Sequence, residues 1–198
     1  IMGWCGKHVG VTVLILLVIG MGLRIGYRGM VDRLERDEIT HIAMVKTFIA
    51  AHGDVKPELQ KTLIHVGYIL HQLNLDVEMG LRCFNLICSC GCLFVMYLLG
   101  KTFFNSSKTG LICLALAVFN PYTIRISGQI MREPLYLLIL SSCLLCASKV
   151  ILCHKTILYS ILLGVLPVLG ILSRYEGIEL FMIMPLTVII CSLSIPRV

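Results

Sequence analysis

Apolar runs of membrane-spanning length are the feature that most limits what this chain can fold into. The first reads HVGVTVLILLVIGMGL, residues 8–23, and carries no Asp, Glu, Lys or Arg. A helix needs about 20 predominantly apolar residues to cross a bilayer. Only 14% of the residues are charged and the mean hydropathy is +0.92, whereas an ordinary soluble domain has about 25% charged residues. The sequence therefore predicts an integral, multi-pass membrane protein.

Six such runs predict an all-α fold, a polytopic membrane helix bundle that forms a single membrane domain over residues 1–198. No small-x-small cleavage site follows the first run, so we interpret it as a retained span and not as a signal peptide. An outer loop, residues 26–80, separates the first span from the second, and the other connections are short. The predicted spans lie near residues 8–25, 81–99, 108–124, 134–153, 156–173 and 177–195.

The long outer loop carries two predicted amphipathic helices. Residues 58–73 have an apolar stripe at helical spacing, formed by Leu59, Leu63, Val66, Leu70 and Leu73. Residues 38–51 have a second stripe, formed by Ile42, Val45, Phe48 and Ile49. Because helices of this kind bury one apolar face in the headgroup region, we expect both to be interfacial helices on the membrane surface.

The acidic residues all fall on one side of the predicted membrane. Alternating six spans places residues 26–80, 120–133 and 174–177 on that side, and these segments or their rims hold all eleven Asp and Glu residues. The opposite side has lysines but no acidic residue, a pattern typical of short cytoplasmic loops. We therefore expect the acidic, active face to lie outside the cytoplasm, in a bacterial inner or plasma membrane or in the endoplasmic reticulum.

The arginines do not follow the lysine pattern. Eight of the nine lie on the predicted outer side, so a plain count of Lys and Arg, six inside and eleven outside, would favour the opposite orientation. Long loops count less in that rule, which softens the conflict. Guanidinium groups hold phosphates through paired hydrogen bonds, so we interpret the outer arginines as functional residues.

The spacing of the cysteines and histidines and the scatter of the basic residues argue against a Cys/His metal cluster and a nucleic-acid-binding patch. Most of the ten cysteines lie inside apolar runs, and alternate residues of CSCGC, 88–92, point to different sides of a helix. Packing explains these residues better than metal binding, and no His, Cys and Asp cluster has metal-ligand spacing. The basic residues are scattered, with no aromatic-rich basic patch, so we expect no nucleic-acid partner.

Asp37 and Glu38 are adjacent carboxylates between the first span and the first amphipathic helix. If the bundle closes, the arginines of the later outer loops would face them. Arginines would hold the phosphate of a phosphate-linked lipid and stabilise its charge as it leaves, while a carboxylate takes the proton of an acceptor hydroxyl. The candidates in the later loops are Arg125, Arg132 and Arg174 for the phosphate, with Glu133 and Glu176 beside them.

Each of these residues also has a purely structural interpretation. Loops of membrane proteins are charged because water surrounds them, and the Asp-Glu pair would then be a solvated helix start. Asp37 and Glu133 would both be favoured in the first turn of a helix. His65 fits a polar surface or interfacial residue better than a ligand.

Four weak motifs occur along residues 8–182 in a fixed order. RDEITHIAMVKTFIAAHGDV follows the first span, LIHVGYIL with His65 follows later in the same loop, and the remaining two are ALAVFNPYTIRISGQIMREPLYLLIL and GILSRYEGIELF. In this order they resemble the GT-C superfamily of lipid-phosphate-sugar glycosyltransferases, and within it the protein O-mannosyltransferase and lipid A aminoarabinose transferase group. LRCFNLICSCGCLFVMYLLGKTFFN is similar to the second span and cytoplasmic link of that group.

The resemblance implies an inverting membrane glycosyltransferase that moves a sugar from a polyprenyl- or dolichyl-phosphate donor to an acceptor hydroxyl on the outer face. It implies that Asp37 is the base, with Glu38 beside it, and that outer-loop arginines contact the lipid phosphate. The implied partners are the donor, a protein or lipid-glycan acceptor and membrane lipids. Members differ in whether they use a divalent metal, so this point stays open. They are also considerably longer, so by this resemblance the chain would be a fragment of such a protein, a truncated gene product or a minimal module.

A non-catalytic polytopic membrane protein, such as an assembly subunit or a transporter fragment, is the alternative. Transporters keep ionisable groups near the bilayer midplane, whereas here these groups lie at the rims of the predicted spans. This distribution argues against ion conduction but fits a scaffold. Convergence of Asp37 with Arg125, Arg132 and Arg174 at one outer cleft would favour the enzyme, and scatter would favour the scaffold.

Overall fold

The chain is helical throughout the part that the computed structural model describes, residues 2–30, 36–52, 61–153 and 156–194. These residues contain no strand, so the prediction of an all-α fold is confirmed. The helices are α1 (Met2–Met30), α2 (Arg36–Ala50), α3 (Lys61–Gln72), α4 (Val77–Phe103), α5 (Ser107–Val118), α6 (Pro121–Ser127), α7 (Glu133–Cys153), α8 (Thr156–Ser173) and α9 (Gly177–Ser194).

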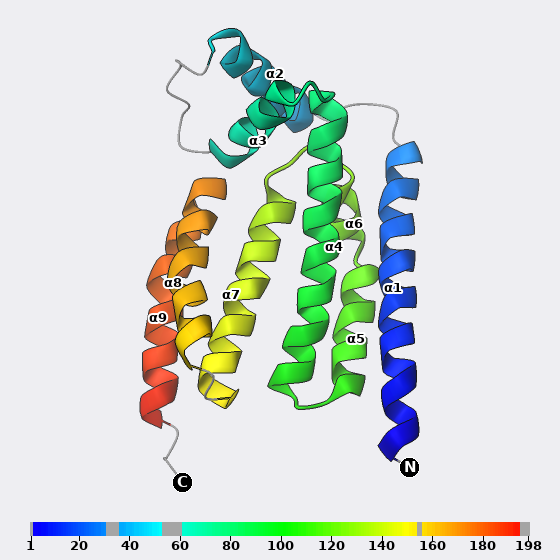
Figure 1. The fold of residues 1–198 in the computed structure, drawn as a ribbon, viewed down its shortest axis with the longest axis vertical. Coiled ribbons are helices and arrows are strands. Elements are labelled where there is room, and N and C mark those ends of the chain that lie inside the picture. Colours follow the sequence, from blue (N-terminus) through cyan, green and yellow to red (C-terminus); the bar gives the residue numbers. More distant parts are fainter. Residues whose placement is uncertain (1, 31–35, 53–60, 154–155, 195–198) are drawn as a thin grey trace.

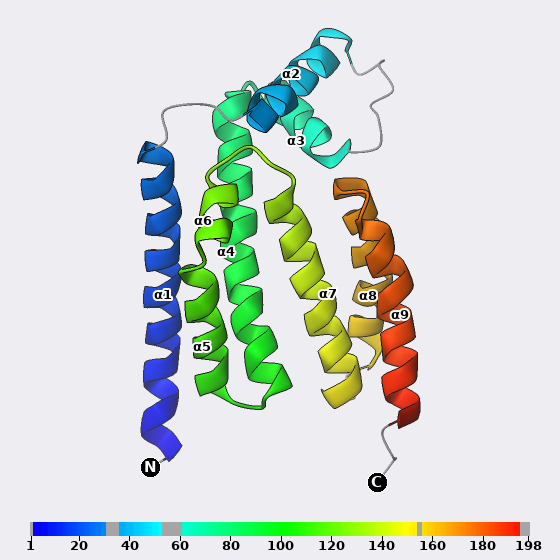
Figure 2. The same cartoon turned by 180° about the vertical axis from the view of Figure 1, so that it is seen from behind.

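The long helices stand side by side and run alternately up and down (Figure 1). Helices α2 and α3 lie across one end of this bundle, close to the α6–α7 and α8–α9 links (Figures 1 and 2). We call this the α2 end. The start of α1, the end of α9 and the α4–α5 link lie at the opposite end (Figure 1).

Three helices of the described chain are long and apolar enough to cross a membrane, namely residues 8–30 of α1, all of α4 and residues 133–152 of α7. The bent pair α5 and α6 would make a fourth span if it counts as one. Helices α8 and α9 are shorter apolar helices over residues 157–173 and 177–186. Each predicted span therefore coincides with a helix or a bent pair, while six membrane crossings remain a prediction.

The predicted span at 108–124 is not continuous, because the chain bends by 62° between α5 and α6. Pro121 opens α6, and the residue before a proline is pushed out of helical geometry. Asn120 accordingly has an extended backbone, with φ −70° and ψ 115°. Its side chain caps α6 by accepting hydrogen bonds from the backbone N–H groups of Tyr122 and Thr123.

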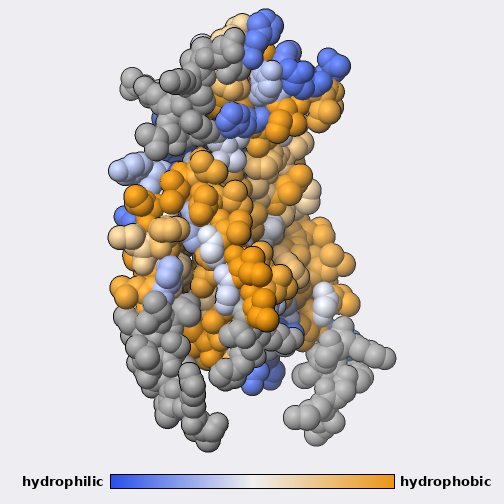
Figure 3. All heavy atoms as spheres, turned by 60° about the vertical axis from the view of Figure 1, so that its left-hand side comes forward, coloured by the Kyte–Doolittle hydropathy of each residue, from blue (hydrophilic) through white to orange (hydrophobic). Residues whose placement is uncertain are grey.

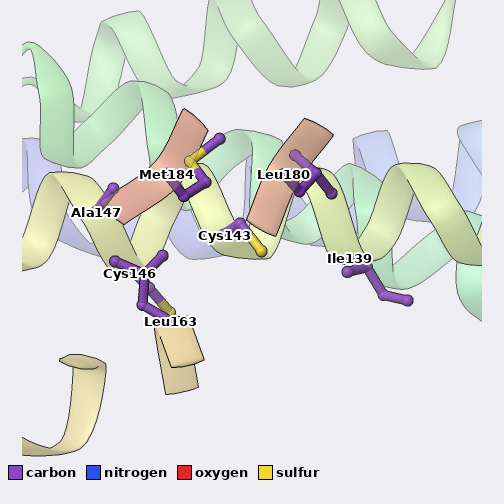
Figure 4. Packing of buried hydrophobic residues seen from close by; sticks show 7 residues of the cluster. All are labelled: Ile139, Cys143, Cys146, Ala147, Leu163, Leu180 and Met184. Atoms are coloured by element: carbon purple, nitrogen blue, oxygen red, sulfur yellow. The ribbon is translucent and has the colours of Figure 1, made fainter. Parts of the chain in front are cut away.

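Three apolar clusters hold the helices together. The first joins α7, α8 and α9, and Figure 4 shows its members Ile139, Cys143, Cys146, Ala147, Leu163, Leu180 and Met184. The second joins α1, α4 and α5 through Val13, Leu93, Tyr97, Leu114 and Val118. The third joins α2 and α3 to the bundle through Ile42, Val45, Leu63, Leu81 and Ile130.

The third cluster decides where the amphipathic stripes of α2 and α3 face. Val45 is 0% exposed and Leu63 is 4% exposed, because both pack against the bundle. The two predicted helices are therefore present, and much of their apolar surface is buried in protein. The start of the predicted 58–73 helix and residue 195 lie outside the described residues, and placement of both helices in the membrane interface stays a prediction.

Large apolar side chains cover the outside of the bundle between its ends (Figure 3). Leu14, Ile87, Leu116 and Met182 are each more than 60% exposed. Hydrophilic residues gather instead at the α2 end in that view (Figure 3). An exposed apolar surface of this kind is expected to face lipid, in agreement with a membrane protein.

Candidate functional site at the α2 end

Glu38 is a fully buried carboxylate that ties α2 to the bundle. It is 0% exposed, and its Oε1 accepts a 3.1 Å hydrogen bond from the backbone N–H of Ile130 in the α6–α7 link. Arg28 of α1 lies 3.7 Å from its Oε2, and Arg82 of α4 lies 3.9 Å from its Oε1. These partners compensate for the loss of water around the carboxylate. Arg82 also pairs with Glu78, one turn away.

Asn85 anchors the same α6–α7 link to α4. Its side chain is 0% exposed, and its Nδ2 donates to the carbonyl oxygens of Gln129 at 2.7 Å and Met131 at 2.8 Å. The buried amide nitrogen and oxygen of Gln129 have no hydrogen-bond partner among the described residues. The link is therefore fixed by its backbone and still presents unsatisfied polar atoms.

Asp37 has the opposite environment from Glu38. It lies in the first turn of α2 and is exposed. Consecutive residues of a helix are about 100° apart around its axis, which explains how one carboxylate is enclosed while its neighbour faces outward. Asp37 is thus the carboxylate of the pair that is accessible from outside the protein.

Arg132 is a cation of this site whose side chain has nitrogens without a hydrogen-bond partner among the described residues. It is half-buried in the α6–α7 link, and its buried Nε and Nη1 have no hydrogen-bond partner within the described part of the chain. Buried polar groups are nearly always paired with protein or water, and an unpaired guanidinium is costly. Its environment is therefore suited to an anion with several oxygen acceptors.

The pKa of His41 in α2 is shifted by charges from both α2 and the α6–α7 region. Burial lowers its pKa, and the positive charge of Arg132 lowers it further, whereas Glu133 and Asp37 act in the opposite direction. The side chains of Asp37, Arg132 and Glu133 thus lie near enough to act on one imidazole. Charges from the start of α2 and from the start of α7 therefore act on the same imidazole at the α2 end.

Arg174 forms a second charged group between α8 and α9. Its Nη1 donates to Glu133 at 3.0 Å, its Nε lies 2.9 Å from Glu176, and its guanidinium carbon lies 5.9 Å from the ring centre of Tyr136. The hydrogen bond from Arg174 holds the pKa of Glu176 below its usual range, and the charge of Arg132 acts in the same direction. Arg132 therefore lies within electrostatic range of both charged groups.

The remaining two predicted site residues are Arg125 and His65. Arg125 is exposed on α6. His65 is exposed on α3 and packs its ring edge-on against Phe48 of α2, with centroids 5.5 Å apart. His65 therefore helps to join α3 to α2, which fits its structural interpretation.

Sequence reasoning missed the residues that enclose Glu38. Arg28 and Arg82 carry ordinary loop and rim charges in the sequence, and only their contacts reveal a shared carboxylate. Gln129 lies in the polar segment 120–133 and offered no signal of its own. Asn85 offered a clearer one, because it is a lone amide inside the predicted 81–99 span. Polar residues at such positions are expected to face the inside of a bundle.

Comparison with known protein families, proteins and structures identifies no relative of this chain. The chain matches no protein-family model, no curated protein and no solved structure. Within the described residues, no group of three or more His, Cys, Asp or Glu side chains could hold a metal ion. The chemistry of the site therefore has to be inferred from its own carboxylates and arginines.

Proposed function

We propose that this chain is a membrane glycosyltransferase that takes its sugar from a polyprenyl- or dolichyl-phosphate donor. The reaction would take place at the α2 end, on the face of the membrane outside the cytoplasm. The observation that carries the proposal is the half-buried guanidinium of Arg132, which has two buried N–H groups unpaired among the described residues, together with the exposed carboxylate of Asp37, whose charge acts on the same His41 imidazole as that of Arg132. A phosphate and a hydroxyl acceptor are the two ligands that this pair suits.

Arg132 would hold the donor phosphate. Guanidinium N–H groups bind phosphate oxygens in pairs. The negative charge on the phosphate grows as the bond from sugar carbon 1 to the phosphate oxygen breaks, and the arginine would stabilise it. Arg174 is already hydrogen-bonded to two carboxylates, so we assign it to positioning Glu133 and Glu176. Arg125 remains a candidate for contacting the lipid phosphate from α6.

Asp37 would act as the base. Its carboxylate takes the proton from the acceptor hydroxyl while the acceptor oxygen bonds to sugar carbon 1 and the lipid phosphate leaves. One displacement inverts the configuration, and no second catalytic carboxylate is needed. Glu38 is enclosed by Arg28, Arg82 and the backbone of Ile130, so we assign it to positioning α2, in place of the catalytic role that the resemblance implies.

The test is transfer of labelled sugar from a lipid phosphate by membranes that contain the full chain. We expect Asp37→Asn to lower the turnover by about 10²–10⁴-fold, the usual contribution of a general base, with donor binding retained. Arg132→Gln should instead weaken donor binding and raise KM. Glu179→Gln removes an exposed carboxylate at the same end of the bundle and should behave as the wild type.

Unchanged transfer by Asp37→Asn would remove this residue from the mechanism. Absence of transfer by the wild-type chain, together with unimpaired folding, would favour the alternative of a non-catalytic membrane subunit. Equal loss in Glu179→Gln and Asp37→Asn would indicate a general effect of charge at this end and no specific base.

A further inference from the structure

A buried arginine stands at the wall of a cavity inside the bundle, away from the site described above. The cavity has a volume of about 320 Å³ and lies between α4, α5, α6 and α7, with Arg24 reaching it from α1. Much of its wall is apolar, and its polar groups include Arg24, Ser89, Asn120 and Thr123. Figure 2 shows the helices that surround it.

Arg24 is held in a defined position by uncharged groups. Its Nε donates to Ser89 at 2.8 Å, its Nη1 to the carbonyl oxygen of Gly20 at 2.9 Å and its Nη2 to Thr123 at 3.3 Å. A side chain at Gly20 would lie 2.9 Å from Leu93 and 3.4 Å from the Arg24 Nη1. Because Gly20 has no side chain, α1 and the Arg24 guanidinium can pack closely against α4.

The positive charge of Arg24 has no acidic partner in the described part of the chain. The residue is 1% exposed, and no ion pair with a described Asp or Glu accompanies its three hydrogen bonds. Guanidinium has five N–H donors, so one N–H on each terminal nitrogen remains available. A buried charge in a membrane-spanning segment is costly unless it is paired, which points to an anion from outside the chain.

The chemistry of the cavity limits that anion to one negative charge with two oxygen acceptors. Two guanidinium N–H groups are the number that a carboxylate uses when it binds bidentately. The next cation along α1, Arg28, is paired with Glu38, so it does not supply a second positive charge. A doubly charged phosphate would therefore keep an uncompensated negative charge in this apolar site.

We propose that this cavity binds a long-chain fatty acid, with its carboxylate on Arg24 and its alkyl chain along the apolar wall. The volume is at the low end of the roughly 300–1,000 Å³ typical of ligand sites, which favours one alkyl chain over two. The lining residues of α4 run from Ser89 to Met96, a rise of about 10 Å along the helix. The site uses none of the residues assigned to sugar transfer, so either proposal can fail alone.

The first test uses the cysteines of the full chain in detergent micelles. Cys92 and Cys113 line the cavity, whereas Cys83 is exposed and does not line it. We expect palmitate to slow alkylation of Cys113 by N-ethylmaleimide severalfold and to leave Cys83 unaffected, as read by mass spectrometry of the peptides. Absence of protection by palmitate, or equal protection by its uncharged methyl ester, would overturn the proposal.

The second test compares binding of radiolabelled palmitate to variants. Arg24→Gln should raise the palmitate Kd about tenfold or more, since it removes a charge-assisted pair, and Lys101→Gln at the opposite end should leave it unchanged. If Arg24→Gln does not fold, Leu116→Trp places a large ring on an exposed lining residue and should abolish binding. Unchanged palmitate binding by either folded variant would overturn the site, and tighter binding of hexadecyl phosphate than of palmitate would overturn the carboxylate assignment.

Discussion

Asp37 and Glu38 show how much two adjacent residues of one type can differ. Asp37 is exposed in the first turn of α2, whereas Glu38 is enclosed by two arginines and a backbone N–H. The apolar stripe of α2 already contained this information. Glu38 precedes Ile42 by four residues and Val45 by seven, so helical spacing places it on the face that packs against the bundle.

We predict that Glu38→Gln destabilises the folded chain by about 2–3 kcal/mol. Removing one partner of a buried ion pair leaves the other charges uncompensated, and here the partial exposure of Arg28 and Arg82, 21% and 24% of their side chains, reduces the cost. Thermal unfolding of the purified chain in detergent measures the change. The matched variant Asp37→Asn alters an exposed group and should stay within about 0.5 kcal/mol of the wild type.

Equal unfolding temperatures for the wild type and Glu38→Gln would show that the enclosed carboxylate does not hold α2 in place. A larger effect for Asp37→Asn than for Glu38→Gln would reverse the assignment of structural and catalytic roles. Loss of transfer in Glu38→Gln without loss of stability would restore Glu38 as a candidate catalytic residue.

The helices themselves were largely predictable, because apolar length and periodicity determine where they form. Their ends follow local chemistry: Asp76 accepts a 2.7 Å hydrogen bond from the backbone N–H of Met79 at the start of α4, and Ser106 does the same for Thr109 in α5. The sequence contains Asn120-Pro121 at the bend, but the predicted span at 108–124 is continuous through this pair. Hydropathy alone does not register a turn inside an apolar run.

The α8–α9 hairpin depends on the absence of a side chain at Gly177. A Cβ at this position would collide with the backbone of Gly170, and glycines permit such close approach of neighbouring helices. We predict that Gly177→Ala destabilises the chain by about 1–3 kcal/mol, the usual cost of overpacking. Thermal unfolding in detergent measures this change in stability.

Gly164→Ala is the matched control in the same hairpin. No atom of a neighbouring element lies within 4 Å of a Cβ placed at Gly164, and alanine is the better helix former. We expect this variant to be as stable as the wild type or slightly more stable. Equal behaviour of the two alanine variants would contradict the close packing of α8 and α9.

At the scale of the whole molecule, the two ends of the bundle carry different charges. Asp37, Glu133 and Glu176 lie at the α2 end, whereas Lys101 and Lys108 flank the α4–α5 link at the opposite end. The sequence predicted this division from the alternation of its apolar runs. It did not predict that Glu38 meets Arg28, Arg82 and the backbone of Ile130, because the packing of α2 over the α6–α7 link is a long-range contact with no local signal.

The central claim is that a lipid phosphate binds at the α2 end beside Arg132. The most direct measurement is photolabelling of the chain in proteoliposomes by a polyprenyl phosphate that carries its reactive group next to the phosphate, followed by peptide mass spectrometry. We expect label in α2 and in the α6–α7 link. The labelling should be strongly reduced in Arg132→Gln and unchanged in Lys101→Gln. Label confined to the end that carries Lys101, or label that is indifferent to Arg132, would contradict it.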